Sequence, residues 1–155
     1  MNSDKYREGL LINAIQNGTV IDHITGGEAL IVLRILGITG STDESVSVAT
    51  NVVSSALGRK DVVKIENREL KDEEVDRIAL IAPRATINII RDHRVVEKKG
   101  VDIPDTLIGV LKCPNPCCIT NTNEPVKSRF SVQGRRLICT YCDTVIGSDI
   151  SSHII

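Results

Sequence analysis

The first hundred residues carry hydrophobic patterns that are typical of short strands and helices. Alternation in GTVIDHI (18–24) predicts a strand, and the apolar run GGEALIVLRILG (26–37) predicts a mostly buried helix that ends at Gly37. Runs rich in β-branched residues, SVSVATNVVS (45–54) and DVVKIEN (61–67), predict two further strands. The short stretch of small residues between these two runs indicates that they form a hairpin.

A second helix and a second hairpin complete this region. ELKDEEVDRIALIA (69–82) has acidic residues in its first turns, apolar residues at helical spacing, and Pro83 directly after it. ATINIIR (85–91) and RVVEK (94–98) predict the hairpin. The order β-α-β-β-α-β with an extra strand is that of a ferredoxin-like sandwich, in which two helices cover one face of an antiparallel sheet. We therefore expect an α+β domain over residues 1–100.

The segment that follows, VDIPDTLIGVLK (101–112), has the character of a linker that contains Pro104. It is more hydrophobic than a free linker, because it includes Ile103, Leu107 and Ile108, so we expect it to dock against one or both domains. It opens a second domain, over residues 101–155, which is predicted to be small and all-β.

All five cysteines lie in this second domain, and they are Cys113, Cys117, Cys118, Cys139 and Cys142. Cys139 and Cys142 have C-x2-C spacing, and Cys113 pairs with either Cys117 or Cys118. Clustered cysteines in a reducing compartment are typical metal ligands, and two short loops with two sulfurs each suit one tetrahedral, structural zinc ion. KSRFSVQGRRLI between the loops predicts a hairpin that turns at Gln133 and Gly134.

This arrangement predicts a zinc ribbon of the rubredoxin-like type. So small a domain has too little core to fold by burial of apolar surface alone, so the metal would supply folding free energy. The tail that contains His153 is expected to be a frayed terminus.

Composition restricts the classes of partner. With 41% hydrophobic and 25% charged residues and a net charge of −1, the chain has the composition of a globular protein. Nucleic-acid binders are usually basic and stack bases on aromatic side chains, and this chain has only two Tyr and one Phe. No stretch has the length of a membrane span or the pattern of a signal peptide, so we expect a cytoplasmic protein that binds neither membranes nor nucleic acid.

Two other interpretations remain at this point. Basic residues make the ribbon locally positive, which is compatible with a zinc-ribbon protein associated with nucleic acid, although the same side chains could face a protein partner; they are Lys127, Arg129, Arg135 and Arg136. A ferredoxin-like domain could also sense an amino acid, but its lysines favour a phosphate ligand. No motif for a nucleophile, a catalytic metal or a Gly-rich phosphate loop indicates an independent enzyme.

Several motifs together resemble one known family. They are GTVIDHI (18–24), GRKDVVKIEN (58–67), ALIAPRATIN (79–88), VVEKK (95–99) and the pair CPNPCC and CTYC. With them, nearly the whole chain resembles the regulatory chain of aspartate carbamoyltransferase. The resemblance implies a non-catalytic, allosteric subunit of pyrimidine biosynthesis, whose first domain binds the nucleoside triphosphates ATP, CTP and UTP and self-associates as a regulatory dimer. Its zinc domain would contact the catalytic chain.

The resemblance also implies which residues bind. Asp22 and Lys64 would hold the ribose and base region, His23 and Lys98 would meet the phosphates, and Lys60 would lie near them. The residues that would line the base pocket are Ile15, Val20, Asn88, Ile90, His93 and Val95. The C-x4-C spacing of the family implies that the zinc ligands are Cys113, Cys118, Cys139 and Cys142.

The residues themselves support part of this picture. Lys60 and Lys64 share one face of a strand, and together with Lys98 and a protonated His23 they would form a polyphosphate site if they converge. Asp22 and His23 are neighbours on a strand, so we expect their side chains on opposite faces, where they cannot readily cooperate. Only a position at the rim, where the strand ends, would bring both to one ligand.

Overall fold

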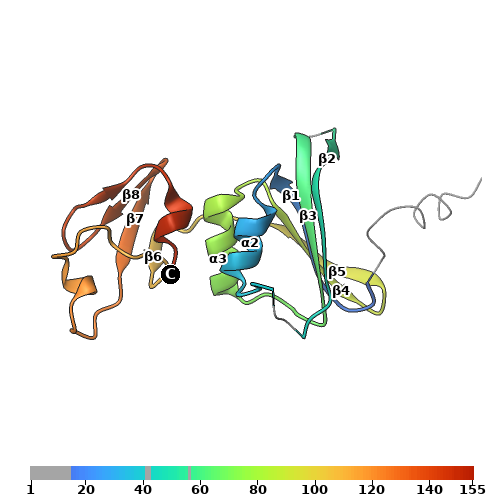
Figure 1. Cartoon of the computed structure of the whole chain (residues 1–155), viewed down its shortest axis with the longest axis horizontal. Coiled ribbons are helices and arrows are strands. Elements are labelled where there is room, and N and C mark those ends of the chain that lie inside the picture. Colours follow the sequence, from blue (N-terminus) through green and yellow to red (C-terminus); the bar gives the residue numbers. More distant parts are fainter. Residues whose placement is uncertain (1–14, 41–42, 56) are drawn as a thin grey trace, which may run out of the picture. The chain divides into compact units, whose positions relative to one another are not determined.

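The computed structural model describes residues 15–40, 43–55 and 57–155, and the chain divides into two compact units between Val101 and Asp102 (Figure 1). The first unit is built on a five-stranded antiparallel sheet with the strand order β2-β3-β1-β4-β5. Over the described ranges, no helix is both long and apolar enough to cross a membrane.

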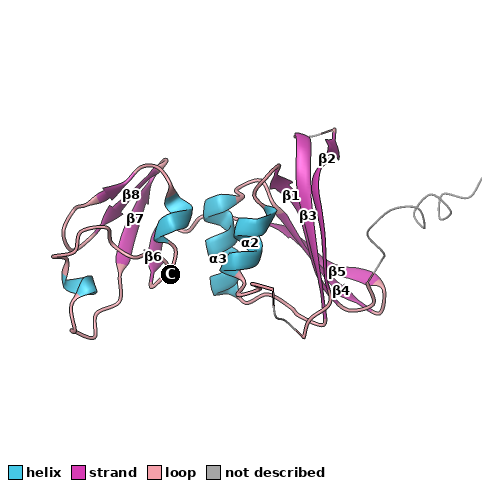
Figure 2. Ribbon diagram, in the orientation of Figure 1, coloured by secondary structure: helices cyan, strands magenta, loops and turns pink. Residues whose placement is uncertain are grey.

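The elements of the first unit follow the predicted order. Its strands are β1 (Gly18–Thr25), β2 (Val46–Ser54), β3 (Gly58–Glu66), β4 (Thr86–Arg91) and β5 (Arg94–Gly100). The helices α2 (Ala29–Ile35) and α3 (Asp72–Ile81) lie together on one face of this sheet (Figure 2). The first four strands have the order of a ferredoxin-like sandwich and β5 extends its edge, so the predicted fold class is confirmed.

The core fills the space between the sheet and the two helices. Alternate strand residues, such as Ile21, Val63 and Ile87, are fully buried there, and they meet Val32 of α2 and Ile78 of α3. Because successive strand residues point to opposite faces, the residues between them lie on the face without helices.

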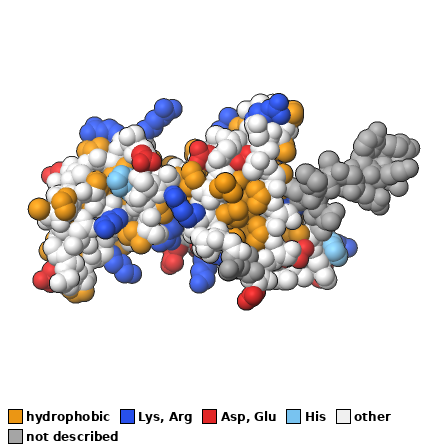
Figure 3. Space-filling model, in the orientation of Figure 1, with side chains coloured by type: hydrophobic (Ala, Val, Ile, Leu, Met, Phe, Trp, Pro, Cys, Tyr) orange, Lys and Arg blue, Asp and Glu red, His pale blue; other side chains and the backbone are white. Residues whose placement is uncertain are grey.

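The prediction of a mostly buried first helix is wrong. Only Ala29 and Val32 of α2 are buried, whereas the side chain of Leu30 is 71% exposed. A helix that lies flat on a sheet can turn only one stripe toward the core, so Leu33 and Ile35 pack against the core while only partly buried, and Leu30 faces outward. Figure 3 shows hydrophobic side chains gathered where the helices of the first unit lie.

Two β-bulges flank β3 at consecutive positions. In β1, Asp22 and His23 together oppose Val62, and in β2, Thr50 and Asn51 together oppose Asp61. His23 and Asn51 have positive φ angles of 57° and 55°, the left-handed conformation that such bulges use.

The second unit is a small sheet of order β6-β7-β8-β9. Its strands are β6 (Thr106–Ile108), β7 (Arg129–Gln133), β8 (Arg136–Cys139) and β9 (Val145–Ile146), and the 3-10 turns are η1 (Ile119–Asn121) and η2 (Ile150–His153). The core of this unit contains Phe130, which is fully buried and pairs with Leu107 and Cys139 on the neighbouring strands.

Two expectations about this unit are wrong. The segment 101–112 is not a linker, because it contributes β6 to the second unit, but its expected docking is confirmed for Leu107, which is only 1% exposed and packs on the face of the sheet that carries Phe130. The tail is not frayed, because the backbone N–H of Lys112 donates to the carbonyl of His153 at 2.7 Å and Ile154 forms a β-bridge with Leu111. Nonlocal backbone pairing, which the local composition does not reveal, orders both segments.

Candidate functional sites: an open sheet face and a four-cysteine cluster

Four of the residues expected to bind nucleotide form one row across the open face of the five-stranded sheet. In strand order, the directly opposed residues are Lys64, Val20, Asn88 and Lys98. Opposed residues of neighbouring antiparallel strands share a face, so these side chains lie side by side. The side-chain amide of Asn88 donates to the carbonyl of Val20 at 3.3 Å. The row therefore has a lysine at each end, and the apolar side chain of Val20 and the amide of Asn88 lie between the two lysines.

The other base-pocket candidates lie toward one end of this face. Ile90 and Val95 oppose each other in the adjacent row, where Ile90 is buried and Val95 is exposed. Ile15 is buried just ahead of β1, and His93 lies in the β4–β5 turn, where its backbone N–H donates to the carbonyl of Gln16 at 2.9 Å. The turn is thereby tied to the segment that precedes β1.

Asp22, His23 and Lys60 meet at a polar corner of the sheet. Lys60 Nζ lies 2.8 Å from Asp22 Oδ1, and the backbone N–H of His23 donates to the same oxygen at 2.6 Å. His23 Nδ1 lies 3.8 Å from Asp22 Oδ2 and 3.2 Å from Thr86 Oγ1. The expectation that Asp22 and His23 point to opposite faces is wrong, because the bulge in β1 breaks the alternation between them.

Thr86 is a part of this corner that the sequence did not reveal. It lies directly opposite Asp22 on β4, and its hydroxyl is the hydrogen-bond partner of the His23 ring. Cross-strand register would have identified it, but the register is not visible in a single sequence.

The pKa values of Asp22 and Lys64 are both shifted by the surroundings of these residues on the open face of the sheet. Burial favours the neutral form of Asp22, but the hydrogen bond from Lys60 and the backbone N–H of His23 outweigh it and lower the pKa of the carboxyl group. Burial lowers the pKa of Lys64, against the opposing charge of Asp22. An anionic ligand beside Lys64 would favour its charged form and gain a stronger contact. Lys98 is exposed, and it forms no ion pair with any residue that the structure describes.

A separate cavity of about 420 Å³ opens at the end of the sheet where β1 begins and β4 ends, away from the polar corner. Its lining residues are Asn17, Gly18, Asn67, Arg68, Glu69, Arg91 and Asp92. Arg91 pairs with Glu69 at 2.6 Å, and Arg68 pairs with Glu44 and Glu74. The positive charges of Arg68 and Arg91 are therefore already neutralised by carboxylates of the same chain. For this reason we expect an anionic ligand to bind more weakly in this cavity than on the open face.

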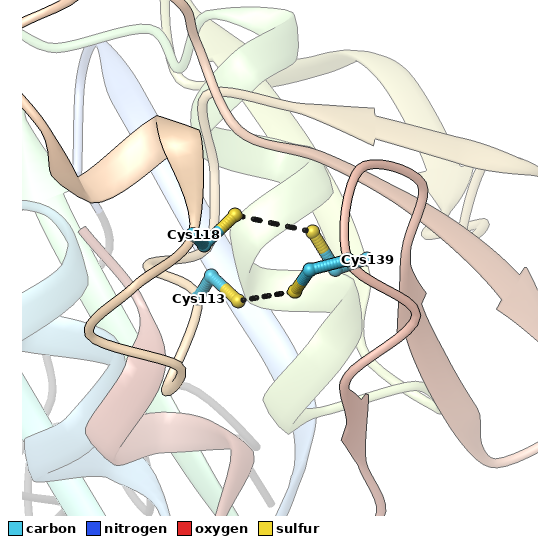
Figure 4. Close-up of side chains that lie close together, drawn as sticks. Cys113, Cys118 and Cys139 are labelled. Carbon is cyan, nitrogen blue, oxygen red and sulfur yellow. Dashed lines mark hydrogen bonds between the residues drawn. The ribbon is translucent and has the colours of Figure 1, made fainter.

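Four of the five cysteines converge in the second unit. The sulfur atoms of Cys113, Cys118, Cys139 and Cys142 all lie within 4.8 Å of one another. The Sγ atoms of Cys113 and Cys142 are 3.5 Å apart, those of Cys118 and Cys139 are 3.8 Å apart, and the labelled side chains point toward one another (Figure 4). Sulfurs at 2.3 Å from a tetrahedral zinc ion would be roughly 3.8 Å apart. The cluster therefore fits one zinc ion, whereas Cys117 is exposed.

The loops around the cluster support its geometry and its charge. The side-chain amide of Asn121 donates to the carbonyls of Cys113 and Asn115, at 2.8 Å and 2.7 Å. The hydroxyl and backbone N–H of Thr144 lower the pKa of Cys142 to about 6, whereas burial raises the pKa of Cys113 to about 12. A bound cation would stabilise the thiolate form of these sulfurs.

Comparison with known proteins identifies both units. Residues 10–102 match the family model described as the allosteric domain of the aspartate carbamoyltransferase regulatory chain, and residues 105–152 match its metal binding domain. Proteins named aspartate carbamoyltransferase regulatory chain from Methanospirillum hungatei, Methanosphaerula palustris and Methanoculleus marisnigri are 71%, 66% and 64% identical, each over 100% of both chains. The chain therefore belongs to the family of aspartate carbamoyltransferase regulatory chains, as a non-catalytic regulatory chain with an allosteric domain and a metal-binding domain.

Proposed function

We propose that this regulatory chain binds nucleoside triphosphates, namely ATP, CTP and UTP, on the open face of its first domain. The observation that carries the proposal is the row from Lys64 through Val20 and Asn88 to Lys98, next to the corner of Asp22, His23 and Lys60. A triphosphate needs several cationic donors in one place, and a base needs an apolar surface with a few polar groups beside it. The row and the corner supply both within three neighbouring strands and the adjoining edge strand.

Each residue has a role in this proposal. Lys98 and His23 contact the phosphates, Lys60 lies near them, and Lys64 and Asp22 hold the ribose and base region. The base lies toward the apolar end of the face, against Val20, Asn88 and the residues beyond them, namely Ile15, Ile90, His93 and Val95. Asp22 also pairs with Lys60, so it holds that ammonium group in place at 2.8 Å.

The second domain contacts the catalytic chain of aspartate carbamoyltransferase in this proposal, and the first domain joins a second copy to form a regulatory dimer. When bound, the zinc ion would cross-link the two cysteine loops. Cys113, Cys118, Cys139 and Cys142 hold it, and the hairpin of β7 and β8 keeps the loops in register. Thiolate ligands persist in a reducing environment, which suits a cytoplasmic location.

The test combines the purified chain with its catalytic chain. Each of ATP, CTP and UTP is titrated against the regulatory chain by calorimetry, and aspartate carbamoyltransferase activity of the reconstituted complex is then followed across the same concentrations. We expect saturable binding and a nucleotide-dependent change in activity. Absence of binding by all three nucleotides would reject the nucleotide site. Co-purification of nucleic acid in place of the catalytic chain would instead support the zinc-ribbon alternative.

A further inference from the structure

Asp61 is a fully buried carboxylate whose contacts join three parts of the first unit. It belongs to β3, directly after Lys60, and its side chain faces the helices. Oδ2 accepts the backbone N–H groups of Gly27 and Ala29 at 2.9 Å each, and Oδ1 accepts that of Asn51 at 2.7 Å. One side chain thereby holds the start of α2 and the bulge of β2 against β3.

These contacts lie where the polar corner is shaped. The β2 bulge opposes Asp61 itself, and the β1 bulge that turns Asp22 and His23 to one side opposes the next residue, Val62. Lys60, on the other side of Asp61, pairs with Val52 immediately after the β2 bulge. A shift of β3 at Asp61 would therefore move the cation that faces Asp22.

We propose that Asp61 is a positioning residue of the nucleotide site, which selects triphosphates by fixing Lys60 and the Asp22–His23 bulge. This inference rests on the proposed nucleotide binding. Asp61 acts from the opposite face of the sheet and touches no ligand. Its effect should be larger for a triphosphate than for a nucleoside, because the backbone that it holds carries Lys60 and His23, whereas Lys64 and the rest of the base-facing row lie farther along the strands.

Asp61→Asn tests this inference with little change in volume. An amide retains one acceptor oxygen, but its NH2 group would face backbone N–H donors, so part of the three-donor arrangement is lost. The affinities of ATP, AMP and adenosine are measured by calorimetry for the wild type and the variant. We expect the ATP affinity to fall about tenfold, as for the loss of a charge-assisted contact, and the adenosine affinity to fall clearly less, so that the ratio of the two affinities changes.

A matched control separates positioning from general destabilisation. Thr19 is also fully buried, on the neighbouring strand, and its hydroxyl donates to the carbonyl of Arg68 at 2.6 Å. Thr19→Val should lower the melting temperature while the ratio of ATP to adenosine affinity stays as in the wild type. An equal loss for all three ligands in Asp61→Asn would overturn the inference.

A second pair of variants covers the case in which Asp61→Asn does not fold. Asn51 is exposed and holds the β2 bulge at a φ of 55°. Asn51→Gly accepts this conformation, whereas Asn51→Val does not. We expect the valine variant alone to lose ATP affinity relative to adenosine. Equal ratios in both variants would also reject the role of the bulge. A wild-type chain that binds none of the three ligands would instead reject the proposed function itself, and this inference with it.

Discussion

At the scale of single residues, the open face combines groups whose charges are already partly matched. Asp22 holds Lys60 at 2.8 Å, and its lowered pKa keeps it ionised at neutral pH. The pair is nearly neutral as a unit, so the net positive charge available to a polyphosphate comes mainly from Lys64 and Lys98, on either side of Val20 and Asn88. Binding should depend strongly on these two lysines.

The first prediction therefore concerns Lys64 and Lys98. Each change, Lys64→Ala or Lys98→Ala, should weaken ATP and CTP binding by about 1.5–3 kcal/mol, because each removes a charge-assisted contact. Calorimetric titration measures the effect. Lys99→Ala is the control, because Lys99 opposes the buried Ile87 and thus points away from the open face. If the isotherms of Lys64→Ala and Lys98→Ala both matched that of the wild type, the proposed nucleotide site would be rejected.

A second prediction at this scale separates the two adjacent cysteines. Cys118 is buried and its sulfur lies 3.8 Å from that of Cys139, whereas Cys117 is exposed. Cys118→Ser should lose bound zinc and unfold the second domain, because that domain depends on its metal for stability. Cys117→Ser should keep one zinc per chain. Elemental analysis of both purified variants measures the zinc content. If only Cys117→Ser lost zinc, Cys117 and not Cys118 would be the ligand.

At the scale of elements, the largest difference between the sequence prediction and the structure concerns β6, which the sequence pattern predicts to be part of a linker. As a linker, residues 106–108 would accept polar substitutions with little effect on stability. As a strand, they bury Leu107 opposite Phe130 and leave Ile108 about half exposed. The same three residues thus contribute both to the core of the second unit and to its surface.

The corresponding prediction compares these two neighbours. Leu107→Ala should destabilise the second domain by about 2–5 kcal/mol, because it removes buried methyl groups and leaves a cavity. Ile108→Ser should change the stability by less than about 0.5 kcal/mol, because its side chain faces outward. Chemical denaturation of the zinc-loaded chain measures both. Similar midpoints for the two variants would contradict the assignment of β6 to the core.

At the scale of the whole molecule, the question is how nucleotide binding in one domain affects a partner of the other. The chain passes once between the two units, near Val101, which is buried in the core of the first, and Asp102, with which the second begins. Allosteric coupling is typically about 1–3 kcal/mol, so a small change in this connection could remove it without unfolding either domain.

The whole-molecule prediction uses two exposed apolar residues of the connecting region. Ile103 and Ile108 are 38% and 52% exposed. The double variant Ile103→Ser, Ile108→Ser should keep nucleotide affinity and zinc content, but flatten the response of the reconstituted complex to nucleotide. Activity assays over a nucleotide series measure this. A full wild-type response would show that the connection is passive.

The sequence by itself determined the order of the elements, the face shared by Lys60 and Lys64, and the spacing of the cysteine pairs. These features depend on patterns within a few residues, because side-chain direction repeats every two residues in a strand and short loops bring C-x2-C sulfurs together. The resemblance to a known family, which the comparisons confirm, also follows from the sequence. The choice of Cys118 over Cys117 came from that resemblance, and the clustered sulfurs agree with it.

Only the tertiary structure decided the bulges, the cross-strand rows and the burial of β6 and of the tail. Each of these depends on which residue of another strand lies opposite, and neither the register nor an inserted residue leaves a local mark on composition. For this reason the alternation rule fails at Asp22 and His23, Thr86 goes unnoticed, and Asp61 looks like one more polar residue in GRKD. Its three backbone partners come from separate segments, and they meet only when β3 is paired on both sides.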